Sequence, residues 1–393
     1  MRNTVIALAI AGMAAAPAFA DSNVTLYGSI DYGFGMRSGN SGLGAGNPNS
    51  NAAAALSTQE FISGTDVQNR LGFKGAEDLG NGTKVIFELE MGFLANTGTN
   101  SLPTVGSESS GIFRNHSWVG LTGDWGTLLG GRVDGARYGV SERYDPFGGG
   151  TVGTPLSMNA QVTRADNAIA YVTPNVQGLY AILAYTTNLV GASNSCASCV
   201  NFLHGSPGSN NADIRLWVVQ LNYVNGPLSV TFNTEHDNFH NLDSRQHVYD
   251  LGASYDFGVA KVMAMWDKVT TDTPGGHPDG FVLGDERTWW VGGTVPITER
   301  DTVRAVYADY KDNTPFSLLV GGQNSCAKWG IGGEHYLSKR TNLYLDFASI
   351  TQHDHGACTI YYNSYQSSLD AGTVSNTGGA GTRGFDLGMV HRF

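Results

Sequence analysis

The sequence predicts an all-β fold, a sixteen-stranded antiparallel barrel that crosses a membrane with its strands. Three observations support this prediction. Apolar and polar residues alternate with a period of two in successive segments of about ten residues. The connections between these segments are alternately short turns and long polar stretches, as in bacterial outer-membrane barrels. Beyond the N-terminal segment, no stretch approaches the roughly 20 apolar residues that a spanning helix needs.

The chain begins with a segment typical of a secretion signal. Arg2 precedes an apolar run over residues 5–16, and residues 18–20 have the small-x-small pattern of a cleavage site. The apolar run is too short for a spanning helix. We therefore expect residues 1–20 to be a cleaved signal peptide and residues 21–393 to form one barrel domain.

The composition suits a barrel wall and argues against some partners. Charged residues make up only 15% of the chain, a low fraction for a water-exposed globule, whereas aromatic residues reach 10% and glycines number 53. These proportions fit a wall with lipid on one side and water on the other. Acidic residues outnumber basic ones by 34 to 23, which argues against nucleic acid as a partner.

The first strand is predicted over residues 24–34, and a long polar segment follows it to about Asn69. Residues 70–78 and 84–93 then form a hairpin around the tight turn at 79–83. The second hairpin strand alternates cleanly between two sets of side chains. One face carries Val85, Phe87, Leu89, Met91 and Phe93, and the other carries Lys84, Glu88 and Glu90. Such alternation predicts a strand with one apolar face and one polar face.

The same unit repeats along the rest of the chain. The further paired strands are predicted at 113–122 and 127–132, 167–173 and 179–187, 215–224 and 228–236, 247–257 and 260–269, 287–296 and 302–311, and 329–337 and 342–352. With a last strand at 383–393, the number is even and both ends of the chain lie on the short-turn side. A barrel of this size encloses a water-filled channel rather than a packed core. No helix and no domain boundary are expected within it.

The last predicted strand ends on an aromatic residue, Phe393. Leu387 and Met389 fall on its apolar face, whereas Asp386 and Gly388 fall on the other. A barrel leaves no unpaired edge only if its last strand pairs with its first. We therefore expect this strand to pair with residues 24–34, and we assign Phe393 to barrel closure and assembly at the periplasmic rim.

Four cysteines occur in this exported chain, so disulfides are permitted. Cys196, Cys199, Cys326 and Cys358 all fall in stretches predicted to be external loops. Four thiols allow three pairings, and the sequence leaves all three open. The expected role is to staple loops. No metal site is expected, because zinc-type ligand spacing is only loosely present near Cys358.

Several segments resemble the general porins of Gram-negative β-proteobacteria. These segments are residues 24–31, 70–80, 118–132, 337–344 and 391–393, and together they span nearly the whole chain after residue 20. The resemblance implies a homotrimer of barrels, each with its third external loop folded into the lumen. It implies a passive diffusion channel for small hydrophilic solutes and ions, surrounded by outer-membrane lipid and lipopolysaccharide, with no cofactor.

The chain departs from this family in three ways. The family is poor in cysteine, and the connections at 188–212 and 353–382 are individual to this sequence. Gly130 and Gly131 precede Arg132 where the family has an apolar residue before a single glycine. A glycine pair can kink a strand, which leaves the direction of the Arg132 side chain open.

The third long connection, residues 133–165, is the constriction loop that the resemblance implies. Its acidic residues Asp134, Glu142 and Asp145 are candidates for the loop side of the constriction. Phe147 lies between a proline and three glycines, which predict a tight reversal, so its ring can anchor the loop tip against the wall.

Basic residues are expected on the wall opposite this loop. Alternation places Arg37, Arg70 and Lys74 on the polar face, and Arg132 is a fourth candidate. A base that faced lipid near the midplane would cost about 2–4 kcal/mol, so Arg70 and Lys74 are expected in the lumen. Acids on the loop and bases on the wall would create a transverse field that screens solutes by charge and dipole.

Other functions remain as alternatives. A substrate-specific channel would share the barrel, and a barrel could also carry an adhesin or an enzyme. The sequence contains no Gly-x-Ser-x-Gly motif and no convincing grouping of nucleophile, base and acid, so no enzymatic activity is expected. A soluble secreted β-domain is the least favoured alternative. The sequence leaves open whether cations or anions pass more readily.

Overall fold

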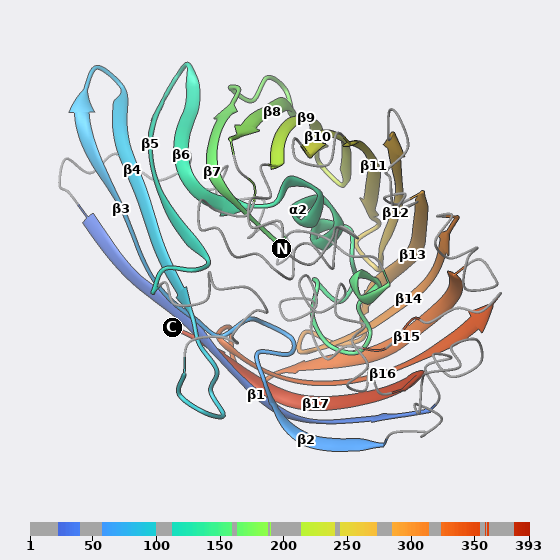
Figure 1. The fold of residues 1–393 in the computed structure, drawn as a ribbon. Helices are drawn as coiled ribbons and strands as arrows, with labels where there is room; N and C mark the ends of the chain where they lie inside the picture. The colour runs from blue at the N-terminus through green and yellow to red at the C-terminus, as the bar shows by residue number, and fades with distance from the viewer. Residues whose placement is uncertain are drawn as a thin grey trace.

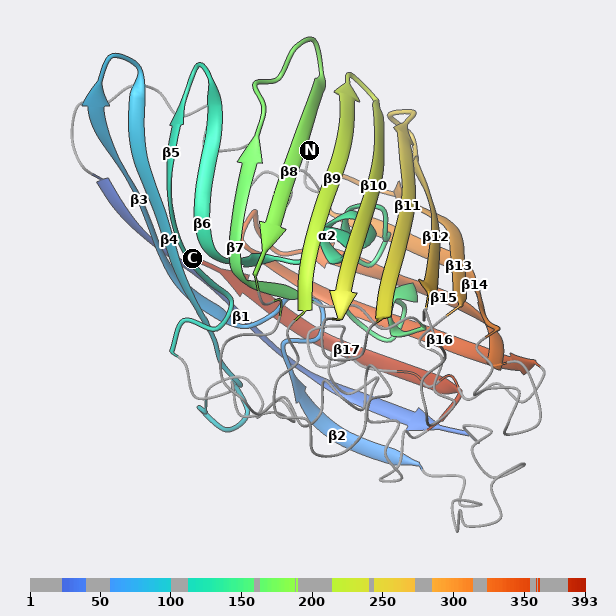
Figure 2. The same cartoon turned by 45° about the horizontal axis from the view of Figure 1, so that its top comes forward.

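The alternating segments of the chain form one antiparallel sheet that closes on itself (Figure 1). The computed structural model describes residues 23–39, 57–99, 112–158, 163–187, 189, 214–239, 244–272, 285–313, 324–353, 358, 360 and 381–393. Neighbouring strands in the sequence are neighbours in the sheet, and β17 returns to β1. Figure 2 shows the strands tilted side by side around the ring. The predicted all-β barrel is therefore confirmed.

The strands occupy sixteen positions around this barrel. They are β1 (Asn23–Ser38), β2 (Thr58–Ser63), β3 (Arg70–Gly80), β4 (Thr83–Gly92), β5 (His116–Gly123), β6 (Gly126–Asp134), β7 (Arg164–Val172), β8 (Leu179–Thr186), β9 (Ile214–Asn225), β10 (Leu228–Phe239), β11 (Ser244–Asp256), β12 (Lys261–Asp272), β13 (Glu286–Pro296), β14 (Asp301–Asp312), β15 (Asn324–Tyr336), β16 (Thr341–His353) and β17 (Arg383–Arg392). Both β2 and β3 pair with β1, at its C-terminal and N-terminal parts respectively. They therefore share one position, interrupted by residues 64–69.

The prediction of a continuous connection to Asn69 is wrong where β2 forms. This strand has only six residues and follows a segment rich in glycine, alanine and asparagine, so its alternation is too brief to recognise. Its Phe61 packs face to face with Tyr32 of β1, with ring centroids 5.8 Å apart. Tertiary pairing with β1, rather than local sequence, establishes this strand.

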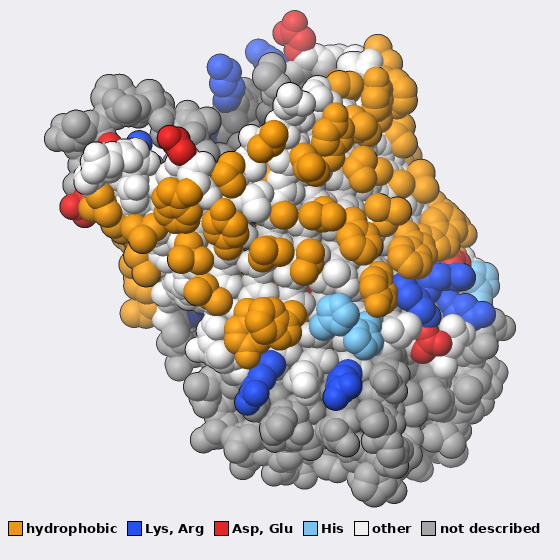
Figure 3. Space-filling model, turned by 90° about the horizontal axis from the view of Figure 1, so that it is seen from above, with side chains coloured by type: hydrophobic (Ala, Val, Ile, Leu, Met, Phe, Trp, Pro, Cys, Tyr) orange, Lys and Arg blue, Asp and Glu red, His pale blue; other side chains and the backbone are white. Residues whose placement is uncertain are grey.

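Each strand has an apolar outer face and a polar or small inner face. On β9, Trp217, Val219 and Leu221 are 61%, 41% and 47% exposed, whereas Gln220 and Asn222 on the other face are buried. Figure 3 shows the hydrophobic side chains as a broad band on one side of the barrel, with basic and histidine side chains near one margin. An exposed apolar band of this kind is favourable in contact with lipid and unfavourable in contact with water. No helix within the described part of the chain is long and apolar enough to cross a membrane.

The first and last strands close the barrel as predicted. Their register runs from Ser29 opposite Arg392 to Ser38 opposite Arg383. Beyond it, the amides of Gly28 and Phe393 each donate to the other's carbonyl oxygen at 3.1 Å. A side chain at position 28 would overlap the Phe393 ring, so glycine is required for this approach. No edge of the sheet is left unpaired at this seam.

The prediction that the barrel contains no helix is wrong between β6 and β7. This connection holds α2 (Ala136–Arg143) and the short 3₁₀ helix η3 (Pro155–Ser157). Residue Gly135 precedes α2 without a capping side chain, and the first turn of α2 has no acidic residue. The usual sequence features of a helix start are thus missing. In Figures 1 and 2, α2 lies within the outline of the strands.

The glycine pair in β6 produces the expected irregularity. Gly131 has a φ of +140°, and the pairing of β6 with β7 shifts register between Gly131 and Val133. Glycine adopts this conformation without the steric cost that a side chain would add. This register shift is a β-bulge, and it ends the regular pairing of β6 just before the chain leaves the barrel wall.

Candidate functional site

The segment 135–158, which follows β6, contacts the inner face of the wall along its length. Its hydrogen-bond partners come from β9, β10, β12, β13, β15 and β17, and most of them are completely buried. They include Asn222, Thr231, Asp267, Trp290, Lys328 and Asp386, each 0% exposed. All of these side chains lie on the face opposite the apolar band. The inner wall, not the lipid-facing surface, therefore holds this segment.

Basic residues of α2 bind acceptors on the wall. Arg137 donates through Nε and Nη2 to the two carboxylate oxygens of Asp267, at 2.7 and 2.8 Å, and its backbone amide donates to Glu235 at 2.7 Å. Arg143 donates to the amide oxygen of Asn222 at 2.7 Å. On this side of the barrel the loop supplies bases and the wall supplies acids.

Tyr144 connects the end of α2 to β10, β11 and β13. Its hydroxyl lies 2.8 Å from Thr231 Oγ1, and its carbonyl oxygen accepts from Trp290 Nε1 at 2.9 Å. The ring lies over Gly252, where any side chain would overlap it. Glycine at this position thus makes room for the Tyr144 ring against the wall.

Asp145 bonds within its own loop. Its carboxylate accepts from the backbone amides of Phe147 and Gly149, both at 2.8 Å, and from the Thr154 hydroxyl at 2.7 Å. Burial raises the pKa of Asp145, while these hydrogen bonds act in the opposite direction. Its carboxylate therefore organises the reversal between α2 and η3.

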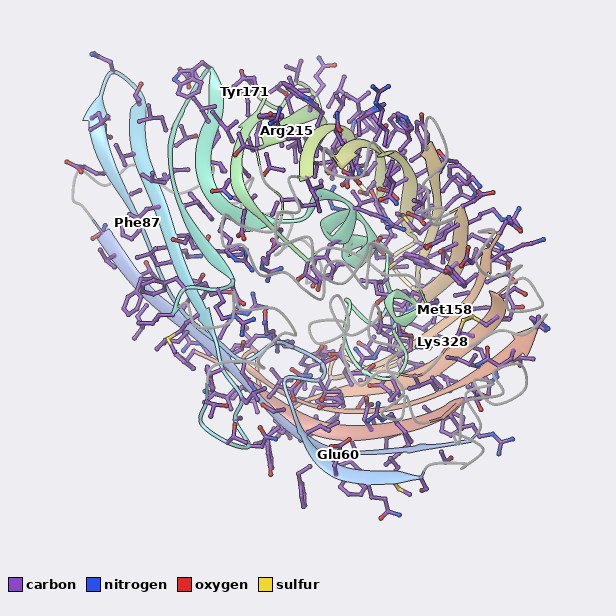
Figure 4. The ribbon with its side chains drawn as sticks, viewed as in Figure 1. Glu60, Phe87, Met158, Tyr171, Arg215 and Lys328 are labelled. Carbon is purple, nitrogen blue, oxygen red and sulfur yellow. A yellow bond between two sulfur atoms is a disulfide. The ribbon has the colours of Figure 1, made fainter. Side chains whose placement is uncertain are left out.

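Phe147 and the residues after it also lie against the wall. The Phe147 side chain is 2% exposed, and the guanidinium carbon of Arg304 lies 4.9 Å from its ring centroid. The amide of Val152 donates to Asp386 at 2.7 Å. Lys328 Nζ donates to Ser157 Oγ at 2.7 Å, and Figure 4 shows Lys328 near the end of this segment.

Three of the predicted site residues, Arg70, Asp134 and Glu142, interact electrostatically with one another. Burial raises the pKa of Glu142 to about 8, and the nearby Asp134 carboxylate acts in the same direction. Arg70 and Arg164 act in the opposite direction because they favour the charged form. Asp134 itself forms ion pairs with Arg164 at 2.7 Å and with His116 at 3.0 Å.

The wall beside this group carries further acids that the alternation of β4 had placed on the polar face. Arg70 lies 3.6 Å from Glu90, and the Tyr27 hydroxyl lies within hydrogen-bonding distance of both Glu88 and Glu90. Lys74 Nζ lies 5.0 Å from the Tyr27 ring centroid. Sequence reasoning found the inner-facing bases and carboxylates. It missed His116, although this residue lay within the predicted strand 113–122, and it missed Arg164, which lay outside the predicted strand 167–173.

One group of described residues could supply three metal ligands within 4.8 Å of one another, namely Glu88, Glu90 and His116. Their atoms already have protein partners. Asn115 donates to Glu90 at 2.9 Å, and His116 Nδ1 lies 3.1 Å from Glu88. We therefore assign this cluster to the hydrogen-bonded wall and not to a metal centre.

The other two predicted wall bases have different partners. Arg37 forms an ion pair with Glu60 at 3.2 Å near the C-terminal end of β1. Arg132 pairs with Asp166 and donates to the Arg114 carbonyl oxygen. The structure does not gather these two bases with Arg70.

One of the possible disulfide pairings is present, between Cys326 and Cys358, whose Cα atoms are 6.4 Å apart. Cys326 is a buried residue of β15, so its expected place in an external loop is wrong. Cys196 and Cys199 lie outside the described residues. The bond therefore joins a strand to the connection between β16 and β17.

Comparisons with known proteins agree with this architecture. The Gram-negative porin family model matches residues 5–355. An outer membrane porin protein of Bordetella pertussis is 29% identical over 374 residues, covering 88% of this chain and 93% of that protein. Outer membrane porin protein 32 of Delftia acidovorans is 27% identical over 368 residues, covering 90% and 91%.

Among solved structures, the anion-selective porin from Comamonas acidovorans has the same fold, with a TM-score of 0.67 at 24% identity. The superposition covers 95% of this chain and 100% of that one. Taken with the closed barrel, its apolar outer band and its charged inner wall, these matches lead to one conclusion. The chain belongs to the Gram-negative porin family and is a diffusion channel of the bacterial outer membrane.

Proposed function

We propose that residues 133–165 are an inward-folded loop that narrows the lumen of this porin, with Asp134 and Glu142 facing Arg70 across the opening. One observation carries the proposal. The segment leaves the wall at β6, near Arg70, and is bound by Arg137 to Asp267 on β12. A chain attached at both places must cross the interior of a closed barrel.

Passage through such an opening needs no covalent step, cofactor or energy source. Solutes small enough to enter would move down their gradients, and the charges of loop and wall would act on them. Walls of low dielectric concentrate that field in the water-filled space, so charge and dipole influence entry more strongly than in bulk water.

The loop is tested by releasing it from the wall. Replacing Arg137 by Ala removes both hydrogen bonds to Asp267, and we expect larger single-channel conductance and entry of larger polyethylene glycols. Arg300→Ala, an exposed residue of a short turn, is the matched control. Equal polymer cut-offs in the wild type and Arg137→Ala would contradict a constricting role for this segment.

We further propose that the protein is a homotrimer. Its relatives are porins, and β1 and β2 expose an aromatic surface that suits contact with a second copy. Phe61 is 64% exposed, and it contacts Tyr32 and Phe34 at centroid distances of 5.8 and 5.7 Å. Chemical cross-linking in mild detergent should give bands up to three subunits. A protein that stays monomeric in every mild detergent would contradict this proposal.

We also propose that phosphorylated lipid, such as lipopolysaccharide, contacts an outward-facing row of bases. Lys268, Arg287 and Lys311 are direct cross-strand neighbours on β12, β13 and β14. Like charges opposite one another are unfavourable unless an anion offsets them, and in this row Lys268 pairs with Asp285. Arg287→Gln/Lys311→Gln should therefore retain less lipopolysaccharide phosphate on purification than the wild type. The control is Lys339→Gln/Arg340→Gln, and equal phosphate in both double variants would contradict the assignment.

A further inference from the structure

Two histidines lie side by side on the outer face of the barrel, near the C-terminal end of β10 and the N-terminal end of β11. His236 and His247 are directly opposite each other in the antiparallel register. Their Nδ1 atoms are 2.8 Å apart, and their ring centroids are 4.7 Å apart. Directly opposite residues have Cβ atoms about 4.5–5.5 Å apart, so both imidazole rings can reach one point between the two strands.

The pair lies at the margin of the apolar band and not within it. On β11, Leu251 is 48% exposed and belongs to the band, whereas the exposed Arg245 lies on the other side of His247. Trp217 lies opposite His236 and is 61% exposed, as is typical of aromatic residues at a membrane–water boundary. Figure 3 shows histidine side chains next to each other at one margin of the hydrophobic band. Ions in the surrounding water can therefore reach the two rings.

Each Nδ1 atom of the pair has the other as its hydrogen-bond partner. Two N–H groups cannot hydrogen-bond to each other, so at least one of the two Nδ1 atoms presents a lone pair. No carboxylate among the described side chains forms an ion pair with His236 or His247 and so favours the charged form of either ring. The neutral imidazole is the form that binds metal ions.

This outer pair differs from the buried group of Glu88, Glu90 and His116. In that group, Asn115 donates to Glu90 at 2.9 Å, and Arg70 lies 3.6 Å from the same carboxylate. A metal ion would have to displace these partners. In the outer pair, only the proton between the two rings has to move.

The separation of the two nitrogen atoms distinguishes between metal ions. Ligand nitrogens about 2.0–2.1 Å from an ion lie about 2.9 Å apart when their bonds meet at about 90°, and about 3.3 Å apart in a tetrahedral zinc site. The observed 2.8 Å matches the first arrangement. Copper(II) prefers this tetragonal geometry, and it also has the highest affinity for nitrogen ligands in the first-row series.

We propose that His236 and His247 form an exposed site for a divalent transition metal, with copper(II) preferred over zinc(II). Both Nδ1 atoms bind the ion, and water fills its remaining positions. The ring that donates through Nδ1 loses that proton and gains one at Nε2, so it stays neutral. The ion links β10 to β11 on the face away from the lumen. The inference is therefore independent of the diffusion channel.

The site is tested by titrating copper(II) chloride into the detergent-solubilised full chain without an added histidine tag. The proteins compared are the wild type, His236→Gln, His247→Gln and the double variant, with His335→Gln/His391→Gln as control. The control removes two exposed histidines that bond to other residues. Losing either ring of the pair should weaken copper binding by at least about tenfold, because the second ligand no longer binds at the high effective concentration that the first provides. The control should bind copper as the wild type does.

Two further measurements define the site. The electron paramagnetic resonance spectrum of the wild-type complex should show coupling of copper to two imidazole nitrogens, and this coupling should disappear in both single variants. Zinc should bind to the wild type more weakly than copper. The KCl conductance should be the same in all of these proteins, because the pair faces away from the lumen.

Three results would overturn the inference. They are equal copper affinity in the wild type and the double variant, no copper binding by folded wild-type protein, and zinc affinity equal to that of copper. A different result at each single variant, with the losses simply adding in the double variant, would also overturn it, because it would mean two independent histidines. If the double variant does not fold to a heat-modifiable barrel, the single variants and the wild-type spectrum decide by the same criteria.

Discussion

Glu142 is a loop residue whose carboxyl group interacts electrostatically with basic side chains of the wall. It lies beside Arg70 and Arg164, and burial raises its pKa to about 8. The carboxyl is therefore largely neutral at low pH and gains its charge as the pH rises through this value. In the proposed opening, this single group would supply a charge that depends on pH.

This dependence yields a prediction for ion selectivity. Between about pH 6 and about pH 10, the reversal potential of the wild type under a KCl gradient should move toward cations as Glu142 ionises. Glu142→Gln should remove most of this movement, whereas Glu299→Gln in a short turn should retain it. An unchanged pH profile in Glu142→Gln would mean that this carboxyl lies away from the ion path.

Asp145 has a different expected effect, because its carboxylate bonds to its own loop. In Asp145→Asn the amide nitrogen replaces an acceptor opposite the donors of Phe147, Gly149 and Thr154. We expect a loss of about 1–3 kcal/mol in stability and noisier channels. Denaturant unfolding in detergent tests this, with Asp124→Asn as control. A clean shift in selectivity at full stability would contradict the structural role.

Residue-level prediction succeeded where strands are regular. Alternation alone placed Arg70, Lys74 and Glu88 on the inner face, because a strand's side chains point to opposite sides in strict order. It gives no information for Asp145 and Arg137, since a loop has no such order and tolerates charge anywhere. Their partners lie far along the chain and are set by the path of the loop.

At the scale of elements, the sequence identified the regular strands and their short turns, but it did not identify β2 or α2. Repetition of the period-two pattern identified β3 to β17, and turn residues fixed their pairing. By contrast, β2 is brief and α2 lacks a cap and an acidic first turn. Both depend on contacts with other parts of the barrel, so their local sequences carry little information.

The disulfide joins β15 to the connection between β16 and β17. It fixes Cys358 to β15, and Ile360 then packs beside Val152 over Gly384 on β17. The Gln352 side chain bonds both the amide and the carbonyl group of Cys358. The start of the last long connection is thereby held against the same segment that follows α2.

Loss of this bond should lower the stability of the barrel. The cysteines are separated by 32 residues, and a loop of this length predicts a loss of about 4 kcal/mol in the chain-entropy treatment. We expect a lower unfolding midpoint for Cys326→Ser/Cys358→Ser in detergent. Reduction should lower the midpoint of the wild type but not lower that of the double variant further. Equal midpoints before and after complete reduction would contradict this role.

At the scale of the whole molecule, closure depends on the seam between β1 and β17. Phe393 contributes two backbone hydrogen bonds with Gly28 and a ring packed beside it. Deleting Phe393 should therefore reduce the yield of heat-modifiable protein in the outer membrane while leaving the conductance of the assembled channels near normal. Phe257→Ala, an exposed aromatic residue of a short turn, is the control. Normal yield of the deletion variant would contradict the closure role.

The barrel architecture was predictable because the membrane requires every backbone group of a spanning strand to be paired. A strand that crosses lipid must pair all its backbone groups, and only closure removes the edges. The opposition of Asp250 to Asp267 and of Glu286 to Asp312 was not predicted, although each residue is visible in the sequence. It arises from the register of β11 to β14, which no local pattern encodes.

The central claim is that this barrel encloses a continuous water-filled path. The most direct test is the current through planar bilayers after addition of the purified protein in KCl. We predict stepwise increases in conductance, with an ohmic relation between current and voltage at each step. Protein that inserts into the bilayer as a folded, heat-modifiable barrel but gives no conductance steps would contradict the account.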